Sequence, residues 1–159
     1  MSNFEKNLEQ ALNNAKRLTD KILIDGKLIS AQTNNKIPVL NPSTGDNIGS
    51  APQCDKNDVN IAVESAYKAF QKWKKIPARE RGKMVAAGAK RLEERKSEIE
   101  TLLSLDTGNA LRTQAIPETA ASIELTNMFA GLSGELKGEN YPTNIPNSIH
   151  YTTRDPIGV

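Results

Sequence analysis

The first residues of the chain carry apolar side chains at a helical spacing. Apolar side chains recur every four residues from Phe4 to Leu12. Ser2 and Glu5 have the spacing of a capping box, in which the side chain of each residue accepts a hydrogen bond from the backbone N–H of the other. The pattern therefore predicts a short amphipathic helix over residues 3–18.

Two β-hairpins are predicted next. Apolar triplets flank Asp25-Gly26, a pair that favours the type I′ turn because both residues tolerate positive φ. Residues 37–40 then have the composition of a strand, and residues 47–51 return after an Asn-Pro-containing turn. Pro38 lacks a backbone N–H, which favours a strand end or a sheet edge.

From Asp55 onward the spacing becomes helical for most of the remaining chain. Asp55 or Asn57 can cap the first of these helices, and Pro77 suits the first turn of the second. A second capping box begins at Ser97, and Gly108 is placed to end that helix. A further helix is predicted over residues 116–136. The stripe of the first helix consists of Val59, Ala62, Val63, Ala66, Phe70 and Trp73.

The last part of the chain changes character again. Residues 138–146 carry two prolines and are predicted to be a loop, whereas residues 148–155 alternate as a strand does. A single late strand needs a partner that this chain barely supplies. The predicted fold is therefore of the α/β class and incomplete, with N-terminal β-hairpins, a helical segment and then a lone strand.

Composition narrows the possible functions. The chain has 159 residues, a net charge of +2 and one cysteine, and its mean hydropathy is −0.53. The densest basic run, Lys72, Lys74 and Lys75, is too small for a dedicated nucleic-acid interface. No stretch is apolar enough to span a membrane, and a single cysteine excludes an internal disulfide. A cytoplasmic protein without nucleic-acid or membrane partners is expected.

The chemically reactive residues do not form a site. Cys54 precedes a predicted helix but has no histidine nearby in sequence, and His150 is the only histidine. Gly131, Gly134 and Gly138 follow a helix, whereas a phosphate-binding loop joins a strand to a helix. Alternating acidic and basic residues on the helices are typical of a solvated face. No catalytic and no cofactor-binding residue is predicted in this chain.

A series of short segments, each weak alone, carries a resemblance through its order and spacing. They are Ile24-Asp25-Gly26-Lys27, Val39 to Gly45, Asp58 to Trp73, Pro77 to Arg81, Leu105-Asp106-Thr107-Gly108, Gly131-Leu132, Gly138-Glu139 and Tyr151 to Val159. Together they resemble the N-terminal portion of NAD(P)-dependent aldehyde dehydrogenases, from about Ile22 to Val159.

The resemblance implies a function for a longer protein. A complete member would oxidise an aldehyde to a carboxylic acid with NAD or NADP. The nucleophilic cysteine, the glutamate base and the oxyanion-binding asparagine of the family would all follow this chain, so the chain alone is expected to be inactive and to bind no cofactor. The resemblance divides the chain into a leader helix (1–20), the N-terminal part of the cofactor-binding domain (21–147) and the start of the oligomerisation strands (148–159).

One family site falls partly within this chain. Many members bind a monovalent cation, K⁺ or Na⁺, and the matching positions are Val39, Leu40 and Asp106. Oxygen ligands suit such a hard cation, but a third segment would have to complete the site. Asp106 could equally serve as a helix-end cap. The pair Asn109-Ala110, after Thr107-Gly108, departs from the commoner family sequence. It resembles the sequence of betaine-aldehyde-type members at this place.

Three interpretations follow. The chain is expected to be a fragment of an aldehyde dehydrogenase, whose partners are the remainder of that chain and, in the complete protein, further copies in a homo-oligomer. It could instead be a non-catalytic binding module that docks on full-length subunits through residues 148–159. A third alternative is one half of a split enzyme, which the DNA downstream of Val159 would reveal.

Overall fold

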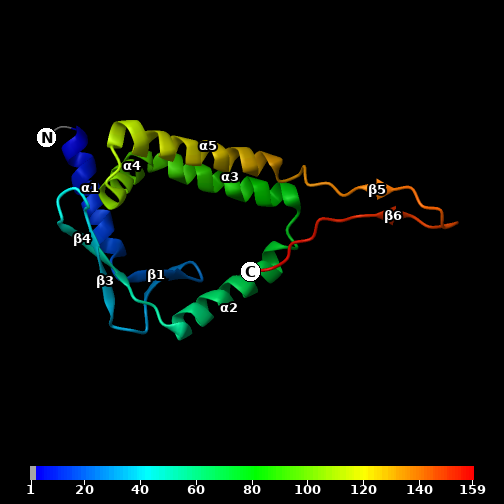
Figure 1. Cartoon of the computed structure of the whole chain (residues 1–159), viewed down its shortest axis with the longest axis horizontal. Coiled ribbons are helices and arrows are strands. Elements are labelled where there is room, and N and C mark those ends of the chain that lie inside the picture. The colour runs from blue at the N-terminus through cyan, green and yellow to red at the C-terminus, as the bar shows by residue number, and fades with distance from the viewer. Residues whose placement is uncertain (1–2) are drawn as a thin grey trace.

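The computed structural model describes residues 3–159. Its elements follow one another around an open ring, from which one long hairpin projects (Figure 1). The helices are α1 (Asn3–Leu18), α2 (Lys56–Trp73), α3 (Ala78–Glu94), α4 (Lys96–Thr107), the π-helical turn η1 (Leu111–Ala115) and α5 (Ile116–Leu132). The strands are β1 (Lys21–Ile24), β2 (Lys27–Ser30), β3 (Lys36–Leu40), β4 (Asn47–Pro52), β5 (Asn140–Tyr141) and β6 (His150–Tyr151).

Both predicted N-terminal hairpins are present. β1 pairs with β2 around Asp25 and Gly26, whose φ angles of 53° and 71° give the positive pair of a type I′ turn. β3 pairs with β4, and a register shift interrupts the ladder between Val39 and Leu40. The helix predicted over residues 3–18 matches α1, although Ser2 of its proposed capping box lies outside the described residues.

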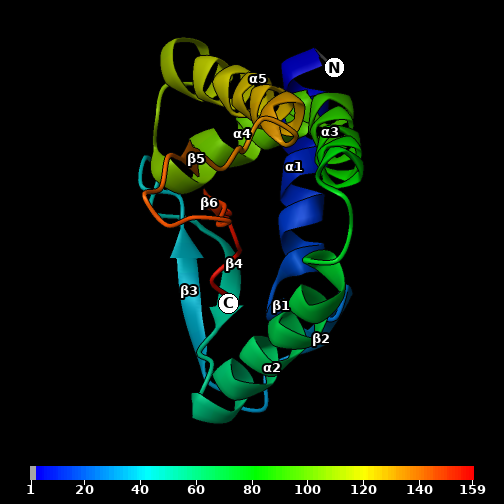
Figure 2. The ribbon, with the colours of Figure 1, turned by 90° about the vertical axis from the view of Figure 1, so that its right-hand side faces the viewer.

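The long helices begin where their capping chemistry indicates. Asp55 caps α2 through a reciprocal box with Asp58, so two backbone N–H groups without helical partners are satisfied. α3 and α5 lie side by side in two views of the molecule (Figures 1 and 2). Gly82 permits this approach, because a Cβ there would collide with the Ala130 carbonyl oxygen and the Ser133 hydroxyl of the facing segment.

Two helix predictions need correction. No capping box forms at Ser97, which lies inside α4, because only Arg95 interrupts the helical path between α3 and α4. The last helix ends at Leu132 rather than at residue 136, and a π-helical turn leads into it. Gly108 ends α4 in the left-handed conformation as predicted, with φ of 75°.

The prediction of a late strand without a partner is also wrong. Within the segment that was predicted to be a loop, β5 pairs with β6, and the Thr152 amide donates to the Glu139 carbonyl oxygen at 2.9 Å. The strand itself is short, with only His150 and Tyr151 in the ladder. The chain therefore supplies a partner strand itself, and the hairpin projects from the body (Figure 1).

The described residues bury few large side chains. The buried apolar positions are Ala11, Ala89, Ala115, Ile123 and Ala130. The accessible surface is 11854 Å², whereas a compact monomer of 17.4 kDa exposes roughly 7,900 Å². Much apolar surface on α2, α5 and the β5–β6 hairpin is therefore exposed. No helix among the described residues is long and apolar enough to cross a membrane.

Candidate functional site

An open pocket of about 390 Å³ lies between α1, β4 and α4. One face of α4 supplies Ile99, Leu102, Leu103 and Asp106, which recur at the three- and four-residue spacing of a helical stripe. The other walls come from Ala15, Leu18 and Thr19 of α1 and its end, Val39 of β3, and Ile48, Gly49 and Ser50 of β4. The pocket is therefore formed by segments that lie far apart in the sequence.

The structure brings two of the three predicted cation ligands to this pocket. Val39 and Asp106 both line it, whereas Leu40 lies outside its lining. The ladder irregularity between Val39 and Leu40 turns this strand end out of regular pairing. Gly108 packs against the neighbouring turn, since a Cβ on it would lie 2.8 Å from Pro42 Cγ. This contact holds the end of α4 beside the end of β3.

Asp106 has no partner in the described part of the chain. No hydrogen bond or ion pair joins its carboxylate there, and the left-handed Gly108 ends the helix instead. No contact among the described residues therefore supports the alternative role of Asp106 as a helix-end cap. Among residues 3–159, no three His, Cys, Asp or Glu side chains gather as a metal-binding group.

Asp20 fixes one end of the pocket. Its carboxylate accepts hydrogen bonds from the Lys36 ammonium group and from Ser50 Oγ, the latter at 2.6 Å, and its backbone N–H donates to the Ser50 carbonyl oxygen at 2.9 Å. The hydrogen bond from Lys36, with that from Ser50, lowers the pKa of the Asp20 carboxyl. Asp20 thereby ties the end of α1 to β3 and β4.

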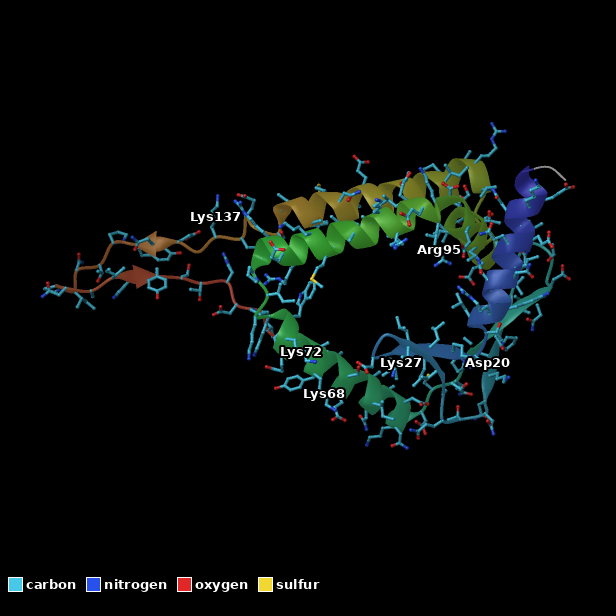
Figure 3. All side chains as sticks on the ribbon, turned by 180° about the vertical axis from the view of Figure 1, so that it is seen from behind. Asp20, Lys27, Lys68, Lys72, Arg95 and Lys137 are labelled. Atoms are coloured by element: carbon cyan, nitrogen blue, oxygen red, sulfur yellow. The ribbon has the colours of Figure 1, made fainter. Side chains whose placement is uncertain are left out.

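Glu98 fixes the other side of α1. Its carboxylate accepts two hydrogen bonds from the Arg95 guanidinium group, at 2.9 and 2.6 Å, and only 7% of its side chain is exposed. Arg95 lowers the pKa of Glu98, with further contributions from Asn14 and Arg17 of α1. Figure 3 shows Asp20 at the end of α1 and Arg95 alongside the helix.

The other candidate residues remain apart from the pocket. Cys54 is an exposed free thiol before α2, and His150 is exposed on β6. The basic side chains of α2 do not converge, because Lys68 pairs with Glu64 and Lys74 lies over the Phe70 ring at 5.0 Å (Figure 3 labels Lys68).

The glycines that follow α5 do not fit a nucleotide. Gly131 and Gly134 sit where α5 ends, and Gly138 leads into β5. A dinucleotide needs the opposite order, a strand followed by a glycine loop and a helix N-terminus. These glycines therefore do not form a dinucleotide-binding loop.

Sequence reasoning missed that α1 forms a wall of this pocket. The signal was present, because Ala11, Ala15 and Leu18 recur at helical spacing and form a second apolar stripe on that helix. Asp20 could not be found in the same way, since its partners Lys36 and Ser50 lie on β3 and β4.

Comparison with known proteins decides the family. A model of the aldehyde dehydrogenase family matches residues 28–159. This chain belongs to the aldehyde dehydrogenase family. Its fold is accordingly an incomplete aldehyde dehydrogenase-like α/β fold, as the sequence motifs predicted.

Individual family members show how much of an aldehyde dehydrogenase this chain represents. Aldehyde dehydrogenase tropH of Talaromyces stipitatus is 38% identical over 140 residues, which are 87% of this chain and 27% of that protein. The chain thus spans about a quarter of the length of the curated relatives that it matches.

Two solved aldehyde dehydrogenases agree in fold. Betaine aldehyde dehydrogenase of Staphylococcus aureus, determined with NAD⁺, is 27% identical with a TM-score of 0.82, over 90% of this chain and 29% of that one. An NAD-dependent benzaldehyde dehydrogenase of Corynebacterium glutamicum is 28% identical with a TM-score of 0.75, over 82% of this chain and 28% of that one.

Proposed function

We propose that this chain is the N-terminal part of an aldehyde dehydrogenase whose complete form oxidises an aldehyde to a carboxylic acid. The match over residues 28–159 to the family model carries the proposal. In that reaction the aldehyde carbon loses a hydride to the cofactor and gains an oxygen from water. NAD is the cofactor favoured for the complete protein, because solved relatives are NAD-dependent or hold NAD⁺.

The proposed role of this chain within the enzyme is structural. The described residues contain no group of three His, Cys, Asp or Glu side chains that could hold a metal ion, and the glycines after α5 do not join a strand to a helix. They do supply exposed apolar surface on α5, including Leu125, Met128 and Phe129. Such a surface suits contact with the remainder of an aldehyde dehydrogenase chain. The residues that perform the chemistry would belong to that remainder.

A chimaeric enzyme tests this proposal. Residues 28–159 would replace the matching segment of the C. glutamicum benzaldehyde dehydrogenase, and NADH formation with benzaldehyde would be followed by absorbance. We expect the chimaera to retain measurable benzaldehyde oxidation, and the same enzyme without the segment to lose it. A folded chimaera without turnover would contradict the proposal.

The isolated chain provides a second measurement. With NAD or NADP and a panel of aldehydes, the purified 159-residue chain is expected to form no reduced cofactor above the blank. Turnover that co-purifies with the chain and survives removal of contaminating enzymes would show that the chemistry does not require the remainder.

A partial monovalent-cation site is the finer part of the proposal. The backbone oxygens of Val39 and Leu40 with Asp106 would supply oxygen ligands for K⁺ or Na⁺, completed by a segment outside this chain. The shared location of Val39 and Asp106 supports it. In the chimaera, exchanging K⁺ for a bulky tetraalkylammonium salt should lower the unfolding temperature, and an unchanged temperature would argue against the site.

The projecting β5–β6 hairpin favours one alternative, a binding module that docks on full-length subunits. Its Ile149 and Tyr151 side chains are 79% and 68% exposed, and Figure 1 shows the hairpin standing clear of the body. Co-elution of this chain with a full-length aldehyde dehydrogenase, abolished by Ile149→Lys, would support docking. Separate elution would exclude it. The same hairpin would serve homo-oligomer formation in a complete enzyme.

A further inference from the structure

We propose that α1 is a positioning element for the monovalent-cation site. It holds the strand that carries Val39 and the helix that carries Asp106 at the separation that a bound cation needs. The inference rests on the cation site of the proposed function, and it extends that site to a helix that lies before residues 28–159, the part that matches the family model. Its support is what α1 contacts on each side.

The end of α1 lies against the pair of strand residues that contains Val39. Gly49 lies opposite Val39 in the β3–β4 ladder. A Cβ on Gly49 would lie 3.0 Å from Thr19 Oγ1 and 4.0 Å from the Ala15 carbonyl oxygen. The glycine therefore permits a close approach of the helix to the strand. Movement of this end of α1 would change the surroundings of the Val39 backbone.

Asp20 fixes this contact through hydrogen bonds to both strands. Its carboxylate accepts from the Lys36 ammonium group and from Ser50 Oγ, and its backbone N–H donates to the Ser50 carbonyl oxygen. Lys36 belongs to β3, the strand that also carries Val39. Figure 3 shows Asp20 at this junction. The end of α1 is thus bound to the whole β3–β4 hairpin.

The other side of α1 packs against α4, the helix that carries Asp106. Glu98 of α4 is 7% exposed, and Asn14 and Arg17 of α1 interact with its carboxylate. Asp106 lies eight residues further along the same helix, which is about 12 Å of helical rise. Because this stretch of α4 is continuous, contacts at Glu98 also fix the position of Asp106 relative to α1.

The docking of α1 and the binding of the cation should therefore favour each other. A cation held by the Val39 backbone and Asp106 stabilises the arrangement in which α1 contacts both β4 and α4. Linkage then requires that docked α1 raises the affinity for the cation by the same factor. Couplings between two sites commonly change affinity about 5- to 150-fold. A helix that only covered apolar surface would show no such dependence on the cation.

Amide hydrogen exchange tests the link in the benzaldehyde dehydrogenase chimaera, rebuilt with residues 1–159 so that it carries this α1. Saturating K⁺ should slow exchange in α1 at least about fivefold relative to a tetraalkylammonium salt. α2, which does not line the pocket, should exchange equally in both salts. Asp106→Asn should remove the effect of K⁺ on α1, and Asp46→Asn, at an exposed carboxylate between β3 and β4, should retain it.

The reciprocal measurement removes residues 1–18. The K⁺ concentration that gives half of the thermal stabilisation should rise by the factor seen in exchange, and if this variant does not fold, the exchange data decide alone. An unfolding temperature that does not respond to K⁺ would remove the cation site and this inference with it. If K⁺ raises the unfolding temperature but leaves α1 exchange unchanged, or if the slowing survives Asp106→Asn, the role of α1 is refuted while the chimaera's activity still supports the proposed function.

Discussion

Single carboxylate side chains hold α1 against its neighbouring elements. Asp20 adopts a left-handed conformation with φ of 60°, and its side chain reaches two strands at once. Aspartate tolerates this backbone region better than most residues because its short polar side chain can bond locally. An aspartate at this position therefore both adopts the left-handed backbone conformation and supplies the negative charge that binds Lys36.

Acid should weaken the contact between α1 and the β3–β4 hairpin. The folded pKa of Asp20 lies below its unfolded value, mainly because of the hydrogen bond from Lys36. The stabilisation is therefore complete above the ordinary carboxyl range, about pH 4, and is lost as the pH falls through the folded pKa. Asp20→Asn should lower the urea midpoint at neutral pH and converge with the wild type in acid.

The matched control is Asp46→Asn, because the Asp46 side chain makes no hydrogen bond or ion pair within the described residues. Its unfolding curve should follow the wild type at every pH. If Asp20→Asn and the wild type differed by a constant amount across the whole range, the charge of Asp20 would not be the cause.

Gly82 and Gly88 form a matched pair on α3. A methyl group at Gly82 would collide with Ala130 and Ser133, whereas nothing lies within 4 Å of a Cβ at Gly88. Gly82→Ala should destabilise the chain by about 1–3 kcal/mol through overpacking, and Gly88→Ala should stabilise it by about 0.5–1 kcal/mol through helix propensity. Thermal unfolding of both variants measures the difference, and equal effects would mean that α3 and α5 do not approach so closely.

At the scale of elements, turns and helix starts could be predicted from the sequence, whereas pairing between distant segments could not. Asp25-Gly26 specifies its turn, as predicted, and Asp55, one of the two predicted caps, specifies its helix start. β5 was missed because only two of its residues pair, in a segment whose composition is typical of loops. The pocket was missed for a different reason. The apolar stripe of α1 is visible in the sequence, but its pairing with α4 is set by tertiary packing.

The link between α1 and α4 should depend on Glu98. Glu98→Gln removes the charge that pairs with Arg95 and that interacts with Asn14 and Arg17 of α1, in a side chain that is almost fully covered. A loss of about 1–2 kcal/mol is expected for hydrogen bonds to a charged group. Amide hydrogen exchange in α1 should accelerate accordingly. Glu94→Gln, which alters the exposed pair with Arg91, should leave α1 protected, and equal acceleration in both variants would refute the role of Glu98.

The molecule as a whole exposes about half as much surface again as a compact chain of its mass. Its buried apolar residues are mostly alanines, and no large side chain among the described residues is fully covered. Net stability of a domain is only about 5–15 kcal/mol. With so little apolar surface buried, a small further loss of core contacts is enough to decide whether the chain stays monomeric or associates.

The isolated chain should accordingly self-associate. Light scattering should show a mass that rises with protein concentration, and a dye that fluoresces on exposed apolar surface should bind strongly. Phe129→Glu, at a residue whose side chain is 63% exposed on α5, should reduce both signals without loss of helicity. A monomer with a sharp, cooperative thermal transition would contradict this expectation.

The pairing of α1 with α4 also constrains the order in which a ribosome can deliver this fold. α1 is made first, but the surface that it packs against, Lys96–Thr107, emerges only after both N-terminal hairpins, α2 and α3. At synthesis rates of about 5–20 residues per second, the helix waits for several seconds before α4 can cover the part of its apolar surface that faces α4. During that interval α1 is a natural target for a chaperone, and codons that slow translation before α4 would lengthen its exposure.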